Sequence, residues 1–108
     1  MSARGTTNRN DRGSAKSRRE RKVWMLGEFG DGETCPCHYC GLALTLATLT
    51  VDRILPGILG GRYVRANIRP ACMGCNSRRG TMLREALKMA RAAGQPLMDA
   101  WARLEAAA

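Results

Sequence analysis

The hydrophobic and polar positions of the chain predict a helix, a small β-region and two further helices. A helix is expected from about Ser17, and residues 29–32, which include two glycines, should stop it, because glycine tolerates the left-handed conformation of a helix cap. Residues 45–54, rich in Leu, Thr and Val, predict a strand or a hairpin. A loop containing glycine and proline then precedes a short extended segment over residues 67–71.

Helical spacing dominates the C-terminal third of the chain. Gly80 marks either the end of a helix or a kink in it, and the Gly-Gln-Pro sequence at residues 94–96 breaks the pattern. The apolar stripe of this helix consists of Met82, Leu83, Ala86, Leu87 and Ala90. A last helix carries a second stripe, formed by Leu97, Ala100, Trp101 and Leu104. Both stripes are interpreted as packing surface, and a partner-binding helix is the alternative.

The composition limits the chain to one small domain that needs additional stabilisation. In a chain of 108 residues with 5% aromatic residues, a core formed by apolar burial alone should be marginal. Residues 1–16, rich in polar residues, Gly and Arg, predict a disordered basic arm, and residues 17–108 predict a single domain. No apolar run approaches the roughly 18 residues of a membrane span, so we expect no membrane partner.

Two cysteine pairs with identical spacing, Cys37 with Cys40 and Cys72 with Cys75, predict a zinc site. Each C-x-x-C sequence places two thiolates on one tight turn, and four sulfur ligands complete a tetrahedral zinc site. Disulfides are the alternative, but no apolar signal segment precedes the cysteines, and thiolate ligands fit a reducing cytoplasm better. We therefore expect a structural Zn²⁺, a cytoplasmic location and one odd thiol, Cys35.

The net charge of +9 is unevenly distributed and indicates a polyanionic partner. Residues 1–22 contain eight Lys or Arg and two acids, whereas residues 53–84 contain seven Arg and no acid. Nucleic acid is the expected polyanion. A solvated arm that only keeps the chain soluble is the alternative, and a membrane surface is disfavoured because the arm lacks an apolar face. The residues that we expect to contact DNA are Arg18, Arg19, Arg21, Lys22, Arg62, Arg65, Arg69, Arg78 and Arg79.

The residues between and after the cysteine pairs follow a recognisable order. The segments are Cys37-x-x-Cys40, Val51-Asp52-Arg53-Ile54-Leu55-Pro56, Gly60-Gly61, Asn67-Ile68-Arg69-Pro70 and Cys72-x-x-Cys75-Asn76. In order, spacing and chemistry they resemble the HNH endonucleases of the ββα-metal, treble-clef type, and look most like the small stand-alone HNH proteins of bacteriophages and their hosts. The resemblance implies an α+β fold, with a small zinc-stapled ββα-metal (treble-clef, HNH-like) core and flanking helices.

The resemblance also implies a second, catalytic metal. Asp52 and Asn76 match the metal ligands of the family motif, and Asn67 matches the middle Asn that orders the loop. Hard oxygen ligands suit Mg²⁺ or Mn²⁺, which would absorb the charge that develops when a phosphodiester is hydrolysed. The alternatives are a turn acid that caps a strand end, for Asp52, and a helix cap, for Asn76.

One position departs from the family pattern, which has Asp-His where this chain has Asp52-Arg53. That His is the general base of the family, and Arg cannot replace it, because Arg stays protonated near neutral pH and has no acceptor nitrogen. Arg53 could instead hold a phosphate oxygen. Tyr63 is the candidate substitute base, and a metal-bound hydroxide is another route. His38, the one histidine of the chain, is interpreted as a neighbour or spare ligand of the zinc site.

Two functions follow from these expectations. The first is a metal-dependent HNH-type DNA endonuclease that nicks or cuts double-stranded DNA in a bacterial or phage-infected host cell. The second is a catalytically inactive, zinc-stapled DNA-binding module with phage packaging proteins as partners. RNA is an alternative substrate, although few aromatic residues are present to stack on unpaired bases. The sequence leaves the target sequence and the oligomeric state open.

Overall fold

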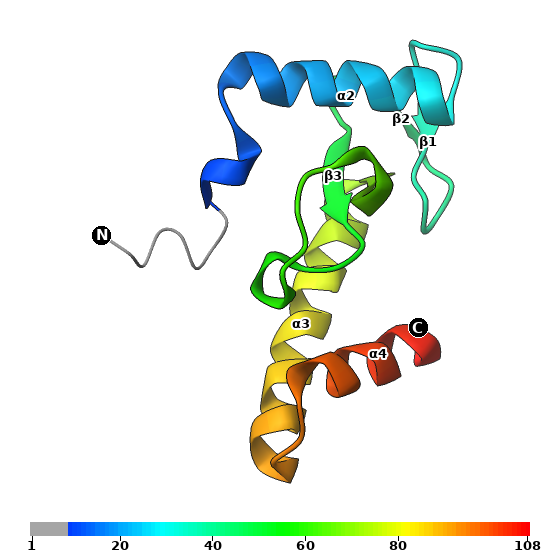
Figure 1. Cartoon of the computed structure of the whole chain (residues 1–108). Coiled ribbons are helices and arrows are strands. Elements are labelled where there is room, and N and C mark those ends of the chain that lie inside the picture. The colour runs from blue at the N-terminus through cyan, green and yellow to red at the C-terminus, as the bar shows by residue number, and fades with distance from the viewer. Residues whose placement is uncertain (1–8) are drawn as a thin grey trace. The chain divides into compact units, whose positions relative to one another are not determined.

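The computed structural model describes residues 9–108 and divides into two units, one ending at Asn76 and one beginning at Ser77. The first unit contains α2, four short strands and three 3-10 turns (Figure 1). Helix α3 begins in the first unit and continues in the second, where α4 follows it. The elements are η1 (Arg9–Arg12), α2 (Ala15–Phe29), β1 (Cys35–Pro36), β2 (Ala43–Leu44), β3 (Thr50–Arg53), η2 (Gly57–Leu59), η3 (Arg65–Asn67), β4 (Ile68–Ala71), α3 (Met73–Ala93) and α4 (Leu97–Ala107).

The arm that the sequence predicts over residues 1–16 lies in part outside the described residues. Residues 1–8 are not described, residues 9–12 form η1, and α2 begins at Ala15. The helix begins slightly earlier than its apolar pattern predicts, because the Ser14 Oγ accepts a hydrogen bond from the Ser17 N–H at 3.1 Å and caps the first turn.

The end of α2 at Phe29 confirms the predicted stop, but the physical reason is different. Gly30, the C-cap residue, has φ −149°, which is extended backbone rather than the left-handed conformation. A Cβ at this position would lie 1.9 Å from the Thr34 carbonyl oxygen, so only glycine allows the two backbone segments to approach. The chain can therefore return directly from α2 into β1.

The strands form two separate two-stranded antiparallel sheets, β1 with β2 and β3 with β4. The predicted extended segment at residues 67–71 is confirmed as β4, whose partner is β3. The predicted strand over residues 45–54 is wrong in its first half, since residues 46–48 form a turn. There the Thr45 N–H donates to the Thr48 Oγ1 at 2.8 Å, so a threonine that favours strands by propensity closes a turn instead.

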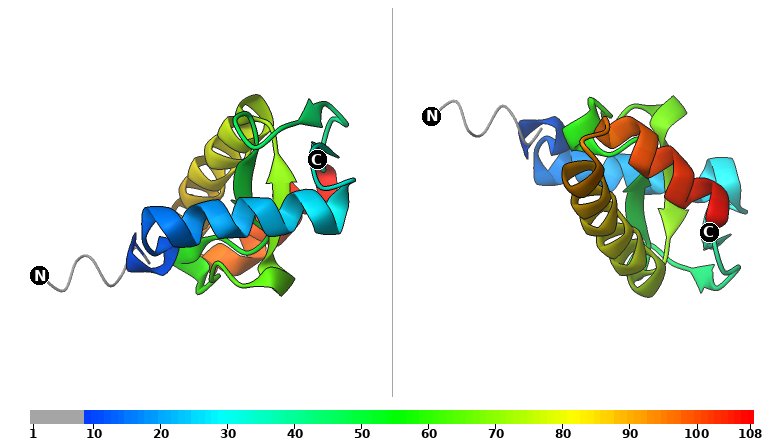
Figure 2. Two further views of the ribbon diagram at one scale, coloured as in Figure 1. Left: turned by 90° about the horizontal axis from the view of Figure 1, so that it is seen from above. Right: turned by 90° about the horizontal axis from the view of Figure 1, so that it is seen from below.

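The core of the first unit lies between α2 and the strands. Helix α2 contacts β1 and β4, and in the views of Figure 2 the green strands run across the direction of this helix. Met25 and Leu44 are completely buried in this core. The buried cluster consists of Met25, Leu26, Cys35, Cys37, Leu44, Leu49, Ile68, Ala71 and Cys75. Three cysteines thus belong to the apolar core, which ties it to the expected metal site.

The second unit is built from the rest of α3 and from α4. Helix α3 continues through Gly80 and ends at Ala93, so the predicted helix end at Gly80 is wrong. Gly94 has φ +62° and allows the chain to leave the helix. Ala86, Ala100 and Trp101 are buried, which confirms that the two apolar stripes are packing surfaces. None of the helices among the described residues has the length and apolar character needed to cross a bilayer.

Candidate active site

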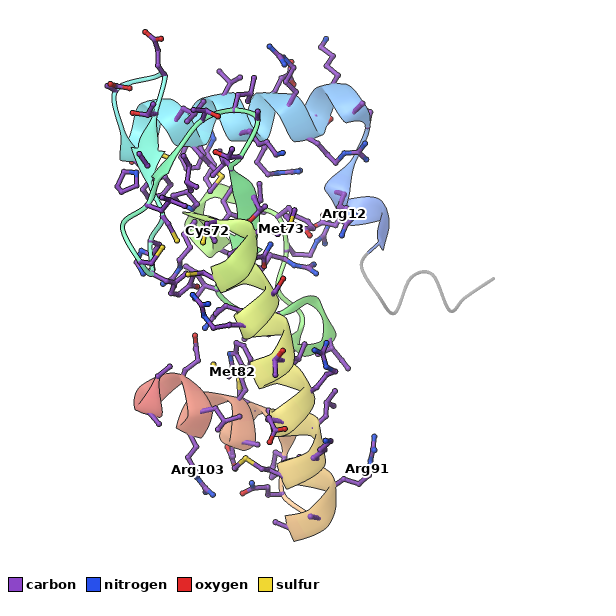
Figure 3. The ribbon with its side chains drawn as sticks, turned by 180° about the vertical axis from the view of Figure 1, so that it is seen from behind. Arg12, Cys72, Met73, Met82, Arg91 and Arg103 are labelled. Carbon is purple, nitrogen blue, oxygen red and sulfur yellow. The ribbon has the colours of Figure 1, made fainter. Side chains whose placement is uncertain are left out.

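The four cysteines of the two C-x-x-C pairs converge on one point. The Sγ atoms of Cys37, Cys40, Cys72 and Cys75 all lie within 4.8 Å of one another, and those of Cys40 and Cys72 are 3.9 Å apart. Four sulfurs bound tetrahedrally to zinc at about 2.3 Å are separated by about 3.8 Å, so the group fits this ion. Cys72, labelled in Figure 3, precedes the first turn of α3. The cluster could therefore hold zinc.

Backbone N–H groups support the cluster in its anionic form. The Cys72 N–H points to the Cys37 Sγ at 3.3 Å, and the Cys75 N–H points to the Cys72 Sγ at 3.4 Å. Burial raises the pKa of Cys37, but these and other hydrogen bonds outweigh it and lower the pKa to about 6. Burial raises the pKa of Cys75 to about 12. Because four adjacent thiolates repel one another, a cation is needed to ionise the whole set.

Cys35 lies outside this group, as the spacing of the cysteines predicts. It belongs to β1 and is 2% exposed in the apolar core. Burial raises the pKa of its thiol, so Cys35 behaves as a small apolar core residue rather than as a metal ligand.

Asp52 lies on β3 opposite Arg69 of β4 and is the one acid buried among the described residues, with 4% exposure. The Tyr39 hydroxyl donates a hydrogen bond to its Oδ2 atom. Tyr39 itself belongs to the first cysteine pair, between His38 and Cys40. The turn of the first cysteine pair therefore reaches directly to the acid that the family motif assigns to the catalytic metal.

His38 and Arg69 form a second contact beside this acid. The Arg69 Nη1 lies 2.6 Å from the His38 Nε2, and the Arg69 guanidinium lies 5.7 Å from the centroid of the Tyr39 ring. Arginine only donates hydrogen bonds, so the His38 Nε2 accepts here. His38 is thus a neighbour of the four-cysteine group and no member of it, which agrees with the first of its two predicted roles.

The orientation of Asn76 is fixed by Thr50. The Thr50 hydroxyl donates its single proton to the Ala71 carbonyl oxygen at 2.7 Å, so the same oxygen must accept from Asn76. The Asn76 Nδ2 accordingly donates to the Thr50 Oγ1 at 3.1 Å. This arrangement leaves the Asn76 Oδ1 as the amide atom that could bind a cation. Because alternate residues of a strand share a face, Thr50 also places Asn76 on the side of β3 that carries Asp52.

Asn67 holds the loop between β3 and β4. Its Oδ1 accepts from the Leu55 N–H at 2.9 Å, and its Nδ2 donates to the carbonyl oxygens of Leu55 and Arg62 at 3.2 and 3.0 Å. A Cβ at Gly61 would lie 1.7 Å from the Leu55 carbonyl oxygen and 2.9 Å from the Asn67 Nδ2. The glycine and the asparagine together make this tight loop, in the way the resemblance implies for Asn67.

Arg53, which stands in the place of the family's histidine, points into the same loop. Its Nη1 donates to the Gly61 carbonyl oxygen at 3.3 Å, and its guanidinium lies 4.3 Å from the centroid of the Tyr63 ring. The Arg21 guanidinium lies 4.9 Å from the same centroid. Tyr63 is therefore in contact with two cations, and the half-buried Arg53 makes contacts within the loop.

A strongly basic hollow of about 280 Å³ opens beside Asn76. Its lining residues come from η1, α2, β3, the loop between β3 and β4, and the beginning of α3. The lining residues are Arg12, Arg18, Arg21, Lys22, Thr50, Val51, Tyr63 and Asn76. Three of the arginines and lysines expected to bind DNA, together with the candidate base Tyr63, thus meet next to one candidate metal ligand.

The other expected DNA contacts are distributed differently. Arg65 lies over the Trp24 ring at 4.8 Å from its centroid, and Arg19 and Arg78 are exposed. Arg79 pairs with Glu105 at 2.6 Å within the second unit, and its side chain is only 11% exposed. Its guanidinium also lies 4.9 Å from the Trp101 ring centroid. Arg79 therefore stabilises the α3–α4 pair and is poorly placed to reach a phosphate.

Three residues at the site were not predicted from the sequence. Thr50 could have been identified, because it stands two positions before Asp52 on a strand and so shares its face. Tyr39 carries no sequence signal apart from its place between two cysteines. Asp11, which binds Arg62 and the Tyr63 N–H, belongs to a segment predicted to be disordered and contacts residues 51 and 52 positions away.

Comparison with known protein families agrees with this geometry. The family model described as HNH endonuclease matches residues 37–91, which is half of the chain and includes both cysteine pairs and the residues from Asp52 to Asn76. No curated protein matches the chain. The matched segment confirms the resemblance given by the sequence motifs, and the chain belongs to the HNH endonuclease family.

Proposed function

We propose that this protein is a metal-dependent endonuclease that hydrolyses phosphodiester bonds in double-stranded DNA. The observation that carries the proposal is the Thr50 network, which engages the Asn76 Nδ2 and so leaves the Asn76 Oδ1 as the amide atom for a cation, in a residue that lines the basic hollow. Asp52 and Asn76 would hold a Mg²⁺ or Mn²⁺ ion, which supplies a positive charge to the leaving oxygen. The four cysteines would hold a structural Zn²⁺.

The basic residues of the hollow provide the substrate contacts of this proposal. Arg18, Arg21 and Lys22 project from α2 into the hollow that Asn76 lines. Guanidinium and ammonium groups neutralise phosphates and hold the backbone in register, without reading the sequence. We accordingly propose cleavage with little sequence specificity, in the cytoplasm of a bacterial or phage-infected cell.

Tyr63 is the side chain that we propose as the general base. It lines the hollow together with Asn76, whereas the His38 Nε2 is engaged by Arg69. A general base contributes a factor of about 10²–10⁴ to the rate. Tyr63→Phe should therefore lower the cleavage rate by at least about 10²-fold, while His38→Ala should leave it close to that of the wild type. The reverse order of effects would assign the base to His38.

The proposal is tested by the cleavage of supercoiled plasmid with Mg²⁺ or Mn²⁺. Asp52→Asn keeps the size of the side chain and a partner for the Tyr39 hydroxyl, but removes the charge that a metal ion needs. It should abolish cleavage and leave the zinc content unchanged. Glu85→Gln, at an acid of α3 whose side chain is 58% exposed, is the matched control and should cleave normally. Wild-type protein that cleaves with neither metal would refute the proposal.

A second candidate function is favoured by one observation, the replacement of the family's base by Arg53. In this alternative the chain is a catalytically inactive, zinc-stapled DNA-binding module, with bacteriophage packaging proteins as its partners. Arg53→His restores a base, and Arg53→Gln is the control that loses the same loop contacts without adding one. Cleavage by the histidine variant alone, with none by wild type or by the glutamine variant, would establish the inactive module.

A further inference from the structure

The segment before residue 37 lies outside the match to the HNH family, yet it supplies half of the basic hollow. Arg12 follows Asp11 in η1, and Arg18, Arg21 and Lys22 belong to α2. Among the residues that the structure describes, no acid lines the hollow. Four cations that face one volume of about 280 Å³ repel one another, and a bound anion relieves this repulsion.

Asp11 fastens η1 to the loop that follows β3. Its Oδ1 lies 2.6 Å from the Arg62 Nη2, and its Oδ2 accepts the Tyr63 N–H at 2.5 Å. The Asp11 side chain is only 14% exposed, although it belongs to a short segment near the N-terminus. Both carboxylate oxygens are therefore used in a contact between segments that are 51 residues apart in the sequence.

A second contact holds Arg12, the residue of η1 that follows Asp11. The Arg21 Nη1 donates to the Arg12 carbonyl oxygen at 3.1 Å, which ties the end of η1 to the middle of α2. Arg12, labelled in Figure 3, lies next to the beginning of α2. With Asp11 bound to the loop and the Arg12 carbonyl bound to α2, the Arg12 side chain is held at the wall of the hollow.

We propose that η1 and α2 form a phosphate-binding site for the DNA backbone, with Asp11 as the residue that positions Arg12 in it. This inference rests on the proposed function, since it places a backbone phosphate beside the phosphodiester that is cleaved at Asn76. Arg12, Arg18, Arg21 and Lys22 bind the phosphate. Asp11 does not touch the DNA, and it acts by holding η1 against the loop that contains Arg62 and Tyr63.

The direction in which Asp11→Asn changes the DNA affinity separates this positioning role from a simple effect of net charge. Removing an acid from a basic protein ordinarily strengthens its binding to DNA, because the net positive charge rises. Asp11→Asn removes an acid but also releases η1, so it should weaken binding. Glu33→Gln, at an exposed acid outside the hollow, is the matched control and should strengthen binding slightly or leave it unchanged. Asp11→Glu retains the charge and should retain most of the affinity.

Binding is measured with a short duplex in the absence of added Mg²⁺ and Mn²⁺, between 50 and 200 mM salt. Each phosphate contact contributes about 0.9 to the slope of log affinity against log salt concentration. When the salt concentration rises fourfold, the affinity of a variant that lacks one contact should therefore fall by a factor about 3.5 times smaller than the factor for wild type. Arg12→Ala and Asp11→Asn should each show this change, and the double variant should show no more than either. Arg103→Ala, at an exposed arginine of α4, should keep the wild-type slope.

Cleavage kinetics provide a second measurement. Asp11→Asn should raise KM with little change in kcat, because the lost contact binds substrate and transition state alike. The phosphate site would be overturned if Asp11→Asn bound DNA more tightly than wild type, as expected for Glu33→Gln. It would also be overturned if Arg12→Ala kept the wild-type salt slope. Both conclusions hold even if wild type cleaves DNA. Loss of binding as expected, in a protein that never cleaves, would support the site and refute only the nuclease.

Discussion

The Thr50 hydroxyl makes two hydrogen bonds, and Thr50→Val removes both while it keeps the shape of the side chain nearly unchanged. The first bond goes to the carbonyl oxygen of Ala71, a residue with no exposed surface, and the second holds the Asn76 amide. Without the hydroxyl, the Asn76 Nδ2 loses its acceptor at Thr50, and this contact no longer distinguishes the Oδ1 from the Nδ2 of the amide. The Asn76 Oδ1 would no longer be held in the position that a metal ligand needs.

Both a stability loss and an activity loss are expected from Thr50→Val. Two hydrogen bonds at about 0.5–1.5 kcal/mol each correspond to a loss of about 2 kcal/mol in the free energy of unfolding. For a domain of this size, that lowers Tm by roughly 8–16 °C. Residues that orient a metal ligand typically change metal affinity or activity by about 10–100-fold when they are replaced. The same factor is expected for plasmid cleavage by Thr50→Val.

Cleavage across a series of Mg²⁺ and Mn²⁺ concentrations separates these two effects. A misdirected ligand should shift the metal concentration needed for half-maximal cleavage upward, whereas a loss of folded protein would lower the maximum alone. Thr50→Ser keeps the hydroxyl and loses only a methyl group, so it should retain the wild-type metal dependence. Equal impairment of Thr50→Ser and Thr50→Val, or normal metal dependence in Thr50→Val, would refute the role of the hydroxyl.

Three further predictions concern the cysteine cluster, Tyr39 and Asp11. Cys72→Ser should abolish zinc retention, measured by elemental analysis, and the cooperative melt, measured by circular dichroism, because metal binding supplies folding free energy. Cys35→Ser should keep the zinc but melt at a lower temperature, because the Cys35 thiol is buried in the core. Tyr39→Phe removes a donor to a buried carboxylate and should lower the unfolding free energy by about 1.5–3 kcal/mol in denaturant titrations. The hydrogen bond from Arg62 lowers the pKa of Asp11 below its ordinary value of 3.8. The difference in unfolding free energy between wild type and Asp11→Asn should therefore be constant from pH 8 to pH 5, and it should decline only as the pH falls below 3.8.

The sequence predicted the parts of the fold that depend on local spacing. The two C-x-x-C pairs, the extended segment at β4 and the apolar stripe of α4 were all recognisable, and the small α+β fold with a cysteine cluster is confirmed. The errors lie where a local preference competes with a specific contact. Thr45 and Thr48 favour a strand by propensity but close a turn, and Gly80 is tolerated inside α3 although it weakens a helix.

The remaining features depend on contacts between distant segments. Asp11 lies in a polar, arginine-rich stretch whose composition predicts disorder, and only the three-dimensional structure brings it to Arg62. The hydrogen bond from Tyr39 to Asp52 likewise joins a metal-binding turn to a strand 13 positions away. Such pairs have no periodicity, so a single sequence contains no pattern from which they could be predicted. The residues named by the family motif were predictable, and Thr50 could have been found from its place two positions before Asp52, whereas Tyr39 and Asp11 could not.

The environment of Arg53 indicates a structural role for this side chain, in addition to the absence of the family's general-base histidine. A Cβ at Gly57 would lie 2.7 Å from the Arg53 Nη1, which is the end of a flexible side chain, so a side chain at position 57 would displace the guanidinium from this place. Together with the Gly61 carbonyl and the Tyr63 ring, this glycine forms a compartment fitted to an arginine. A histidine is too short to fill it and would leave the loop less well supported. The arginine therefore holds the loop that carries Tyr63, and any proton transfer at this site must be carried out by another group.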